Sequence, residues 1–230
     1  MKAGQIVALG GGGFSMEETP VLDDYILSLS ENKRPRICFV PTASGDSESY
    51  IARFYRRFRE PRCVPTHLSL FNRDGRNLSE FATSQDVIYV GGGNTANMLA
   101  IWRLHGWDKA LRDAFEAGTI LAGVSAGSIC WFETGVTDSF GDQLAPLDCM
   151  GFLSGSNCPH YDGESARRPA YHRLVSEGMA PGIAADDGVA LHFVESRLHR
   201  VVASRSQAKA YRVELIADKV TETVLAPELL

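Results

Sequence analysis

Residues 119–129 read Thr-Ile-Leu-Ala-Gly-Val-Ser-Ala-Gly-Ser-Ile, and this stretch decides the expected fold. An apolar run typical of a buried strand leads into Gly123-Val124-Ser125-Ala126-Gly127, and a helix-like apolar run, Ser128 to Phe132, follows directly. Glycines on both sides of Ser125 permit a sharp, strained turn that lifts the hydroxyl out at the carboxyl end of the strand. A serine presented in this way is typically a nucleophile. The same letters also fit a glycine-rich joint whose serine only caps a helix, so the surrounding sequence has to decide.

The composition is that of an ordinary globular chain. It has 230 residues, of which 44% are hydrophobic, enough for one domain with a sizeable core. The net charge is −5 without long runs of like charge, which argues against a nucleic-acid surface. The longest apolar stretch, Ile120 to Phe132, contains Gly and Ser and is too short to span a bilayer. We expect a single domain over residues 1–230, with neither a nucleic acid nor a membrane as partner.

The cysteines and the amino terminus indicate a compartment. The five cysteines are odd in number and lack C-x-x-C spacing, which favours a reducing compartment over a disulfide framework or a zinc site. The amino terminus runs from a short apolar stretch into Gly10–Gly13 and does not have the pattern of a signal peptide. We therefore expect a cytoplasmic protein.

Strand-like and helix-like segments alternate through the first two-thirds of the chain. This alternation predicts a mainly parallel central sheet with helices on both faces, a three-layer α/β/α arrangement. After about residue 180, short apolar segments joined by turn-like residues predict a C-terminal antiparallel hairpin or meander. Strands are expected over 5–9, 36–40, 63–70, 86–90, 182–185, 189–194, 198–203 and 209–216 and directly before Ser125, and helices over 17–30, 48–60, 95–104 and 107–117.

Ligands of parallel sheets bind beyond the carboxyl ends of the strands. Four loops rich in Gly or Ser fall at such ends and are expected to converge on one crevice: Gly10–Gly13, Pro41–Ser44, Gly91–Asn94 and the turn at Ser125. The first of them does not fit a dinucleotide fingerprint, because Ser15 stands where the third glycine belongs.

A nucleophilic serine needs a base, an orienting acid and oxyanion donors. His160 is the best base among the six histidines, because it lies in a polar loop that Pro159 would stiffen. Asp138, in a loop between Ser125 and His160, is the preferred acid. Glu133 is the alternative acid, and Asp142 and Asp148 stay open.

The oxyanion donors are expected on both sides of the nucleophile. The backbone N–H of Ala126, the residue after the serine, is the usual first donor. The second is expected at Gly92, because a glycine loop lets backbone amides approach a ligand closely. The same loop also fits a plain strand-to-helix turn with Asn94 or Thr95 as the helix cap.

Three motifs together point to a family: Val-Gly-Gly-Gly-Asn-Thr at 90–95, Gly-Val-Ser-Ala-Gly-Ser at 123–128 and Asn-Cys-Pro-His-Tyr at 157–161. With these motifs in this order, nearly the whole chain resembles the peptidase E (aspartyl dipeptidase) family of serine peptidases. The resemblance implies a fold like that of class I glutamine amidotransferases, with serine in place of their cysteine. It also implies cleavage after an amino-terminal aspartate in small peptides, without a metal or cofactor.

Residue roles follow from this resemblance. It implies Ser125 as the nucleophile and His160 as the base, and Asp138 falls at the family's acid position by its distance from His160. Related cyanophycin-cleaving enzymes use a glutamate there, which keeps Glu133 as the alternative.

The resemblance also implies a substrate pocket. The arginine that binds aspartate is expected just past the histidine loop, where Arg167 and Arg168 are the candidates, and Asp187 is expected to hold the substrate amine. Asn94 is a further candidate for substrate binding. The expected partner is a small peptide, and the sequence leaves open whether the chain forms a homodimer.

Two other functions are weighed against this one. An esterase of the α/β-hydrolase type has its histidine far downstream and a His-Gly motif before the elbow. Here His160 follows Ser125 by only 35 positions, and His105-Gly106 is expected in a joint between helices. A non-catalytic, amidotransferase-like binding module is disfavoured because serine, histidine and candidate acids are all present. Isoaspartyl or cyanophycin-derived substrates stay open within the peptidase hypothesis.

Overall fold

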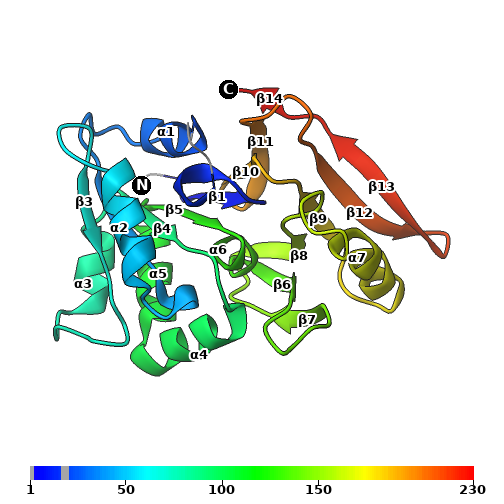
Figure 1. Ribbon diagram of the computed structural model, residues 1–230, viewed down its shortest axis with the longest axis horizontal. Coiled ribbons are helices and arrows are strands. Elements are labelled where there is room, and N and C mark those ends of the chain that lie inside the picture. Colours follow the sequence, from blue (N-terminus) through cyan, green and yellow to red (C-terminus); the bar gives the residue numbers. More distant parts are fainter. Residues whose placement is uncertain (1–2, 17–20) are drawn as a thin grey trace.

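An eight-stranded sheet forms the larger part of the computed structural model, which describes residues 3–16 and 21–230 (Figure 1). The strand order is β14-β11-β10-β1-β5-β4-β2-β3. The five strands from β1 to β3 in this order are parallel, whereas β10 is antiparallel to β1 and to β11. The bounds are β1 (Gln5–Leu9), β2 (Arg36–Val40), β3 (Val64–His67), β4 (Val87–Val90), β5 (Ile120–Val124), β10 (Val189–Val194), β11 (Arg197–Ala203) and β14 (Glu228–Leu229).

Helices cover both faces of this sheet, because successive side chains of each strand point to opposite faces. In β2, Phe39 packs on the side of α1 (Val21–Ser28) and α2 (Glu48–Arg57). Its neighbour Cys38 joins the opposite core, which also contains side chains of three further helices. These are α3 (Leu78–Thr83), α4 (Thr95–His105) and α5 (Trp107–Glu116). The expected three-layer α/β fold is confirmed.

The core under α1 and α2 is built from aromatic rings. Phe39 stacks on Phe54 with ring centroids 5.0 Å apart, and Phe14 meets Phe39 edge to face at 5.3 Å. All three side chains are buried, and full burial of each contributes about 2 kcal/mol. Phe14 comes from the loop after β1, so this cluster anchors the start of that loop.

A second, six-stranded sheet has the order β13-β12-β9-β8-β6-β7, and it corrects the expectation of one central sheet. Its strands β6 and β8 read Phe-Glu-Thr-Gly-Val-Thr and Leu-Ser-Gly-Ser-Asn-Cys, without the apolar runs that predict buried strands. The expected C-terminal meander is in fact divided, because β10 and β11 belong to the large sheet while β9 and the β12–β13 hairpin belong to the small one. The bounds are β6 (Phe132–Thr137), β7 (Ala145–Asp148), β8 (Leu153–Cys158), β9 (Gly182–Ala185), β12 (Ala210–Ile216) and β13 (Lys219–Leu225).

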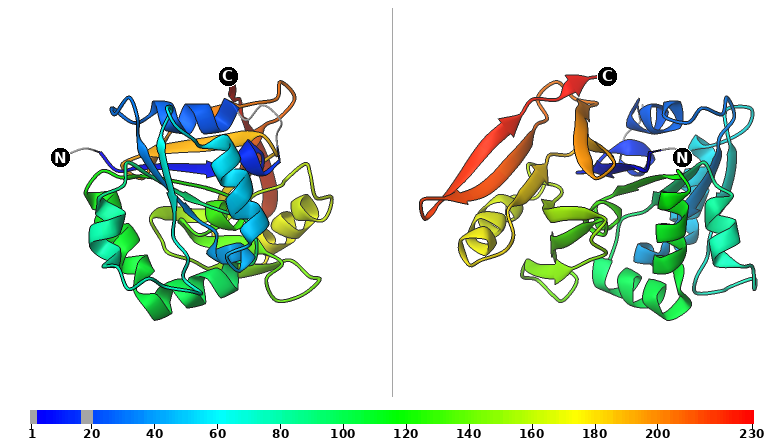
Figure 2. Two further views of the ribbon diagram at one scale, coloured as in Figure 1. Left: turned by 60° about the vertical axis from the view of Figure 1, so that its left-hand side comes forward. Right: turned by 180° about the vertical axis from the view of Figure 1, so that it is seen from behind.

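The remaining helices are short or lie on the small sheet. Helix α7 (Arg167–Ser176) packs on it through Tyr171 and Leu174, and Figure 2 shows α7 and the β12–β13 hairpin together at one end of the molecule. The 3-10 turns η1 (Gly13–Ser15) and η2 (Thr42–Ser44) and the four-residue helix α6 (Ala126–Ile129) follow the ends of strands. Residues 17–20 of the expected first helix lie outside the described residues. Within residues 3–16 and 21–230, no helix combines the length and apolar character needed to cross a membrane.

His192 is a buried histidine in β10 whose two ring nitrogens are both occupied. Nδ1 lies 2.7 Å from the Tyr25 hydroxyl and Nε2 lies 3.0 Å from Oε1 of Gln5. Burial lowers the pKa of His192 to about 4, and the nearby charges of His199 and Arg200 act in the same direction. The neutral ring is therefore the form that the fold accommodates.

We predict that His192 makes the protein acid-sensitive. A depressed folded-state pKa stabilises the fold fully above the ordinary histidine pKa of about 6.5, and this stability is lost as the pH falls toward the folded value. Between pH 7 and 4.5 the loss should be about 2–3 kcal/mol, measured by urea unfolding at each pH. His192→Gln should flatten that slope, whereas His105→Gln at the end of α4 should not. Equal slopes for wild type and His192→Gln would contradict the prediction.

Candidate active site

Ser125 occupies the strained turn that the sequence predicts between β5 and α6. Its backbone has φ 59° and ψ −114°, a conformation that costs a non-glycine residue on the order of 1–3 kcal/mol. A Cβ atom on Gly123 would lie 2.2 Å from the carbonyl oxygen of Gly127, and one on Gly127 would lie 2.4 Å from that of Val90. Both glycines are therefore required for the tight approach of α6 to the sheet, which presents the serine at the strand end.

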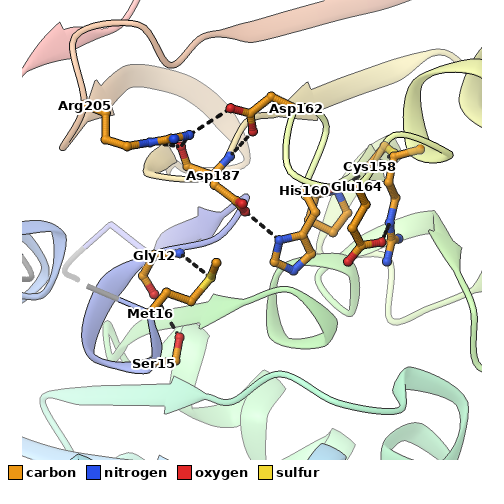
Figure 3. A network of polar contacts seen from close by, with 11 residues as sticks. Gly12, Ser15, Met16, Cys158, His160, Asp162, Glu164, Asp187 and Arg205 are labelled. Carbon is orange, nitrogen blue, oxygen red and sulfur yellow. Dashed lines mark hydrogen bonds and ion pairs between the residues drawn. The ribbon is translucent and has the colours of Figure 1, made fainter. Parts of the chain in front are cut away.

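His160 lies in the loop between β8 and α7 and is paired with a carboxylate (Figure 3). Its Nδ1 is 2.6 Å from Oδ1 of Asp187, which follows β9 in the connection to β10. The two side chains are only 13% and 19% exposed, so solvent weakens this contact little. Such a bond fixes the ring orientation and leaves Nε2 as the proton acceptor.

Backbone carbonyl groups at the end of β1 accept hydrogen bonds from the loops that contain Ser125, His160 and Asp187. The carbonyl oxygens of Leu9, Gly10 and Gly11 accept hydrogen bonds from the backbone N–H groups of Ser125 (3.3 Å), His160 (3.0 Å) and Gly188 (3.1 Å), respectively. Serine, histidine and the residue after Asp187 are thus placed by consecutive peptide groups of one strand end. The hydroxyl of Ser125 makes no hydrogen bond within the described residues, and such bonds often tighten only when substrate binds.

The histidine–carboxylate pair fits against glycine backbone. A Cβ atom on Gly11 would lie 1.9 Å from Oδ1 of Asp187 and 3.0 Å from Nδ1 of His160. A Cβ atom on Gly163 would lie 2.2 Å from the other carboxylate oxygen. No side chain fits at either position unless Asp187 moves.

A buried hydrogen-bond chain ties α6 to the histidine strand. The Ser128 hydroxyl donates to Oδ1 of Asn157 over 2.9 Å, and Nδ2 of Asn157 donates to the Ile183 carbonyl oxygen over 3.0 Å. Both side chains are fully buried. This chain fixes β8, and with it His160, relative to the serine turn.

The expected oxyanion residues are arranged next to the serine. Gly92 adjoins it, since a Cβ atom there would lie 3.2 Å from the Ser125 Cβ atom. The Gly92 N–H, however, donates to the buried Tyr50 hydroxyl over 3.4 Å, a long hydrogen bond that a stronger acceptor could replace. Ala126 is the first residue of α6, where backbone N–H groups lack partners within the helix.

The structure does not bring the expected acids to His160. Asp138 is exposed, and its loop is tied to the start of α4, where Nδ2 of Asn94 donates to the Ser139 carbonyl oxygen over 3.0 Å. Glu133 is exposed in β6 and accepts a hydrogen bond from the Gly155 N–H over 2.7 Å. The carboxylate at His160 belongs to Asp187, which the sequence analysis placed at the substrate amine. Asp142 and Asp148 are exposed as well.

Two of the expected substrate-binding residues have structural partners. Arg167 is 3% exposed and donates to the Val136 carbonyl oxygen over 2.8 Å and to Glu164 over 2.6 Å. Asn94 caps α4, because its Oδ1 accepts from the Asn97 N–H over 2.8 Å.

Arg168, the second expected arginine, forms an ion pair with Glu222 of β13 and lies over the rings of Tyr161 and Tyr211. The hydroxyl of Tyr161 and the imidazole of His172 contact the same carboxylate. Although burial raises the pKa of Glu222, its bonds with Arg168, Tyr161 and His172 bring it below the usual value. Arg168 therefore already has an anionic partner.

Comparison with known proteins identifies the family. The sequence pattern of peptidase family S51 matches residues 6–201, so the chain belongs to this family. It is 56% identical over 223 residues to the uncharacterized peptidase YgaJ of Bacillus subtilis, covering 96% of each chain. It is 26% identical over 188 residues to peptidase E of Shewanella denitrificans, covering 75% of this chain and 78% of the relative.

Solved structures share the fold. The crystal structure of a peptidase from an acI-B1 actinobacterium matches with a TM-score of 0.73 at 20% identity and covers 98% of this chain and 95% of that one. A putative peptidase E from Listeria monocytogenes matches with a TM-score of 0.64 at 17% identity, covering 88% and 98%. The expected family is confirmed, and the protein is a peptidase of the peptidase E type.

The pairing of Asp187 with His160 had a faint signal in the sequence. Asp186-Asp187-Gly188 stands between two expected strands, at a point where a side chain can reach the crevice. What the sequence did not show is that the connection from β9 to β10 crosses from one sheet to the other beside His160. Tyr50, Asp162 and Arg205 were not predicted as site residues, because each acts through a contact distant in sequence. Asn157 was noted only as part of the motif at 157–161.

We predict that Gly11→Ala lowers activity far more than it lowers stability. The added Cβ atom must displace the Asp187 carboxylate, and a misplacement of about 1 Å at a reacting centre can cost about 100-fold in rate. The measurements are kcat for a cleaved dipeptide and the melting temperature. Gly75→Ala is the control: the added atom meets open space, but φ is 80°, so this variant shows what a strained alanine distant from the site costs in stability. Near-normal kcat in Gly11→Ala would show that Asp187 tolerates displacement.

Proposed function

We propose that this peptidase is a serine exopeptidase that hydrolyses short peptides through an acyl-enzyme at Ser125. The observation that carries the proposal is the imidazole–carboxylate pair of His160 and Asp187, held by the same strand end as the strained serine turn. This arrangement has the parts of a nucleophile, a base and an orienting acid.

In the proposed mechanism, Oγ of Ser125 attacks the peptide carbonyl carbon while Nε2 of His160 takes the hydroxyl proton. Asp187 keeps the Nδ1 proton in place and stabilises the imidazolium. The N–H groups of Ala126 and of the Gly92 loop stabilise the oxyanion. His160 then gives this proton to the leaving amine as the peptide C–N bond breaks, which leaves an acyl ester on Ser125. In the second half, Nε2 of His160 takes a proton from water as the water oxygen attacks the ester carbon. The proton returns to Oγ of Ser125 as the ester C–O bond breaks, which releases the acid product and restores the free serine.

For specificity, we propose an amino-terminal aspartate as the preferred first residue, on the resemblance of this chain to aspartyl dipeptidases. An acidic substrate needs a local cation, because the chain carries a net charge of −5. Of the two expected arginines, only Arg168 has an accessible side chain, 49% exposed, and it would have to exchange Glu222 for the substrate carboxylate.

We predict that Ser125→Ala lowers kcat by about 10⁴-fold or more without lowering the melting temperature, given how such catalytic units respond to loss of one member. The assay compares Asp-Leu, Ala-Leu, N-acetyl-Asp-Leu and p-nitrophenyl acetate, and a fluorophosphonate should label Ser125 in the wild type. Equal cleavage of Asp-Leu and Ala-Leu would remove the aspartate preference alone. Labelling at another residue, or an active Ser125→Ala variant, would remove the serine mechanism.

We also predict which carboxylate orients the base. Asp187→Asn should lower kcat by about 10⁴-fold, because an amide at this position favours the wrong histidine tautomer. Asp138→Asn and Glu133→Gln should change kcat by only a few-fold, since neither side chain contacts His160. The three variants should melt at similar temperatures. If Asp138→Asn is inactive and Asp187→Asn is active, the assignment made from the sequence is restored.

A further inference from the structure

Behind the Asp187 carboxylate, on the side away from His160, lies a second set of polar contacts (Figure 3). Arg205, in the connection from β11 to β12, donates from Nε to the Asp187 carbonyl oxygen over 2.9 Å, and Nη2 donates to the same oxygen. That Nη2 also lies 2.9 Å from Oδ2 of Asp162. Oδ1 of Asp162 accepts the Asp187 N–H over 2.8 Å. One ion pair thus holds both polar backbone atoms of Asp187.

The backbone next to Asp187 leaves room for the Arg205 guanidinium. Gly188, the residue after Asp187, has φ 78°, and a Cβ atom there would lie 2.9 Å from Nε of Arg205. On the other side, Asp186 and Lys209 exchange hydrogen bonds: Asp186 N–H donates to the Lys209 carbonyl oxygen over 3.0 Å, and Lys209 N–H donates to Oδ2 of Asp186 over 2.8 Å. The loop containing Arg205 is therefore fastened next to the residue that it contacts.

The contribution of this ion pair to overall stability is expected to be small. The side chains of Arg205 and Asp162 are 49% and 40% exposed, and exposed ion pairs contribute about 0–1 kcal/mol. Its geometry has a larger consequence, because an aspartate side chain is short. The Asp187 carboxylate is packed closely against Gly11 and Gly163, so its position follows that of its own backbone.

We propose that Asp162 and Arg205 are positioning residues that fix the Asp187 carboxylate against Nδ1 of His160. This inference rests on the proposed function, in which Asp187 orients the base. Neither residue is assigned contact with the substrate, so their effect should fall on the chemical step and not on substrate binding.

The test compares Arg205→Ala, Asp162→Ala and the double variant with Arg34→Ala. Arg34 forms an ion pair with Glu60 at similar exposure, 48%, and is a matched control. For a cleaved dipeptide, Arg205→Ala and Asp162→Ala should each lower kcat by about 10- to 100-fold, as expected for misplacement of about 1 Å, with KM changed less than about threefold. Fluorophosphonate labelling of Ser125 should slow by a similar factor. The double variant should be no worse than the more impaired single variant, since the residues act as one unit.

A spectroscopic readout separates positioning from general destabilisation. The low-field proton resonance of the Nδ1–H bond to Asp187 should be present in the wild type and in Arg34→Ala, and shifted or lost in Arg205→Ala. Asp162→Asn keeps the acceptor for the Asp187 N–H and should retain more activity than Asp162→Ala. If an alanine variant does not fold, Asp162→Asn and Arg205→Lys carry the test, with kcat and the resonance expected to change together.

The outcomes distinguish the two proposals. A wild type that fluorophosphonate does not label at Ser125 overturns the proposed function, and the positioning role with it. Labelling at Ser125 combined with Arg205→Ala and Asp162→Ala that match Arg34→Ala in kcat and in the resonance overturns the positioning role alone. A rise in KM at unchanged kcat also overturns it, because that result belongs to a substrate-binding residue.

Discussion

The site depends on how closely other loops can approach the backbone at the end of β1. Three consecutive carbonyl groups there accept hydrogen bonds from Ser125, His160 and Gly188. This approach is possible because residues 10 and 11 are glycines: a Cβ atom on Gly10 would lie 2.4 Å from the Asp186 carbonyl oxygen, and one on Gly11 would meet the Asp187 carboxylate. The glycine run after β1 resembles a nucleotide-binding loop in composition. Here its backbone instead positions the loops that contain Ser125, His160 and Gly188.

The segments that bond to this end of β1 come from both sheets and from the connections between them. The chain leaves the small sheet after β9, passes Asp187 and enters the large sheet at β10, then returns to the small sheet after β11 past Arg205. Both crossings lie on the same side of His160 (Figure 3). The proposed acid and its backbone contacts thus come from the junction between the sheets, whereas the proposed nucleophile comes from the large sheet and the proposed base from the loop after β8.

Much of the large sheet could be predicted from the sequence, because its strands are short apolar runs that end in Gly or Pro. The spans of β1 and β2, the presence of a strand before Ser125 and the strained turn at Ser125 were all predicted in this way. The small sheet could not be, since β6 and β8 owe their burial to tertiary contacts such as the Ser128–Asn157 bond and not to an apolar pattern. The same limit applies to the site. His160 stood out by its loop, but no local pattern reports that Asp187, 27 residues later, meets it at 2.6 Å.

The β12–β13 hairpin contacts the segments that follow His160 and therefore contributes to the site. Its Glu222 contacts Tyr161, Arg168 and His172, which lie on the loop after His160 and on α7. Burial, followed by the bond to Glu222, raises the pKa of Tyr161, so this hydroxyl stays a donor to the carboxylate across the neutral range. His160 is therefore bounded on its amino-terminal side by the buried Asn157 and on its carboxyl-terminal side by Tyr161 and the hairpin. The proposed base, His160, is thus held by contacts from both sheets, which explains why residues so late in the chain contribute to the site.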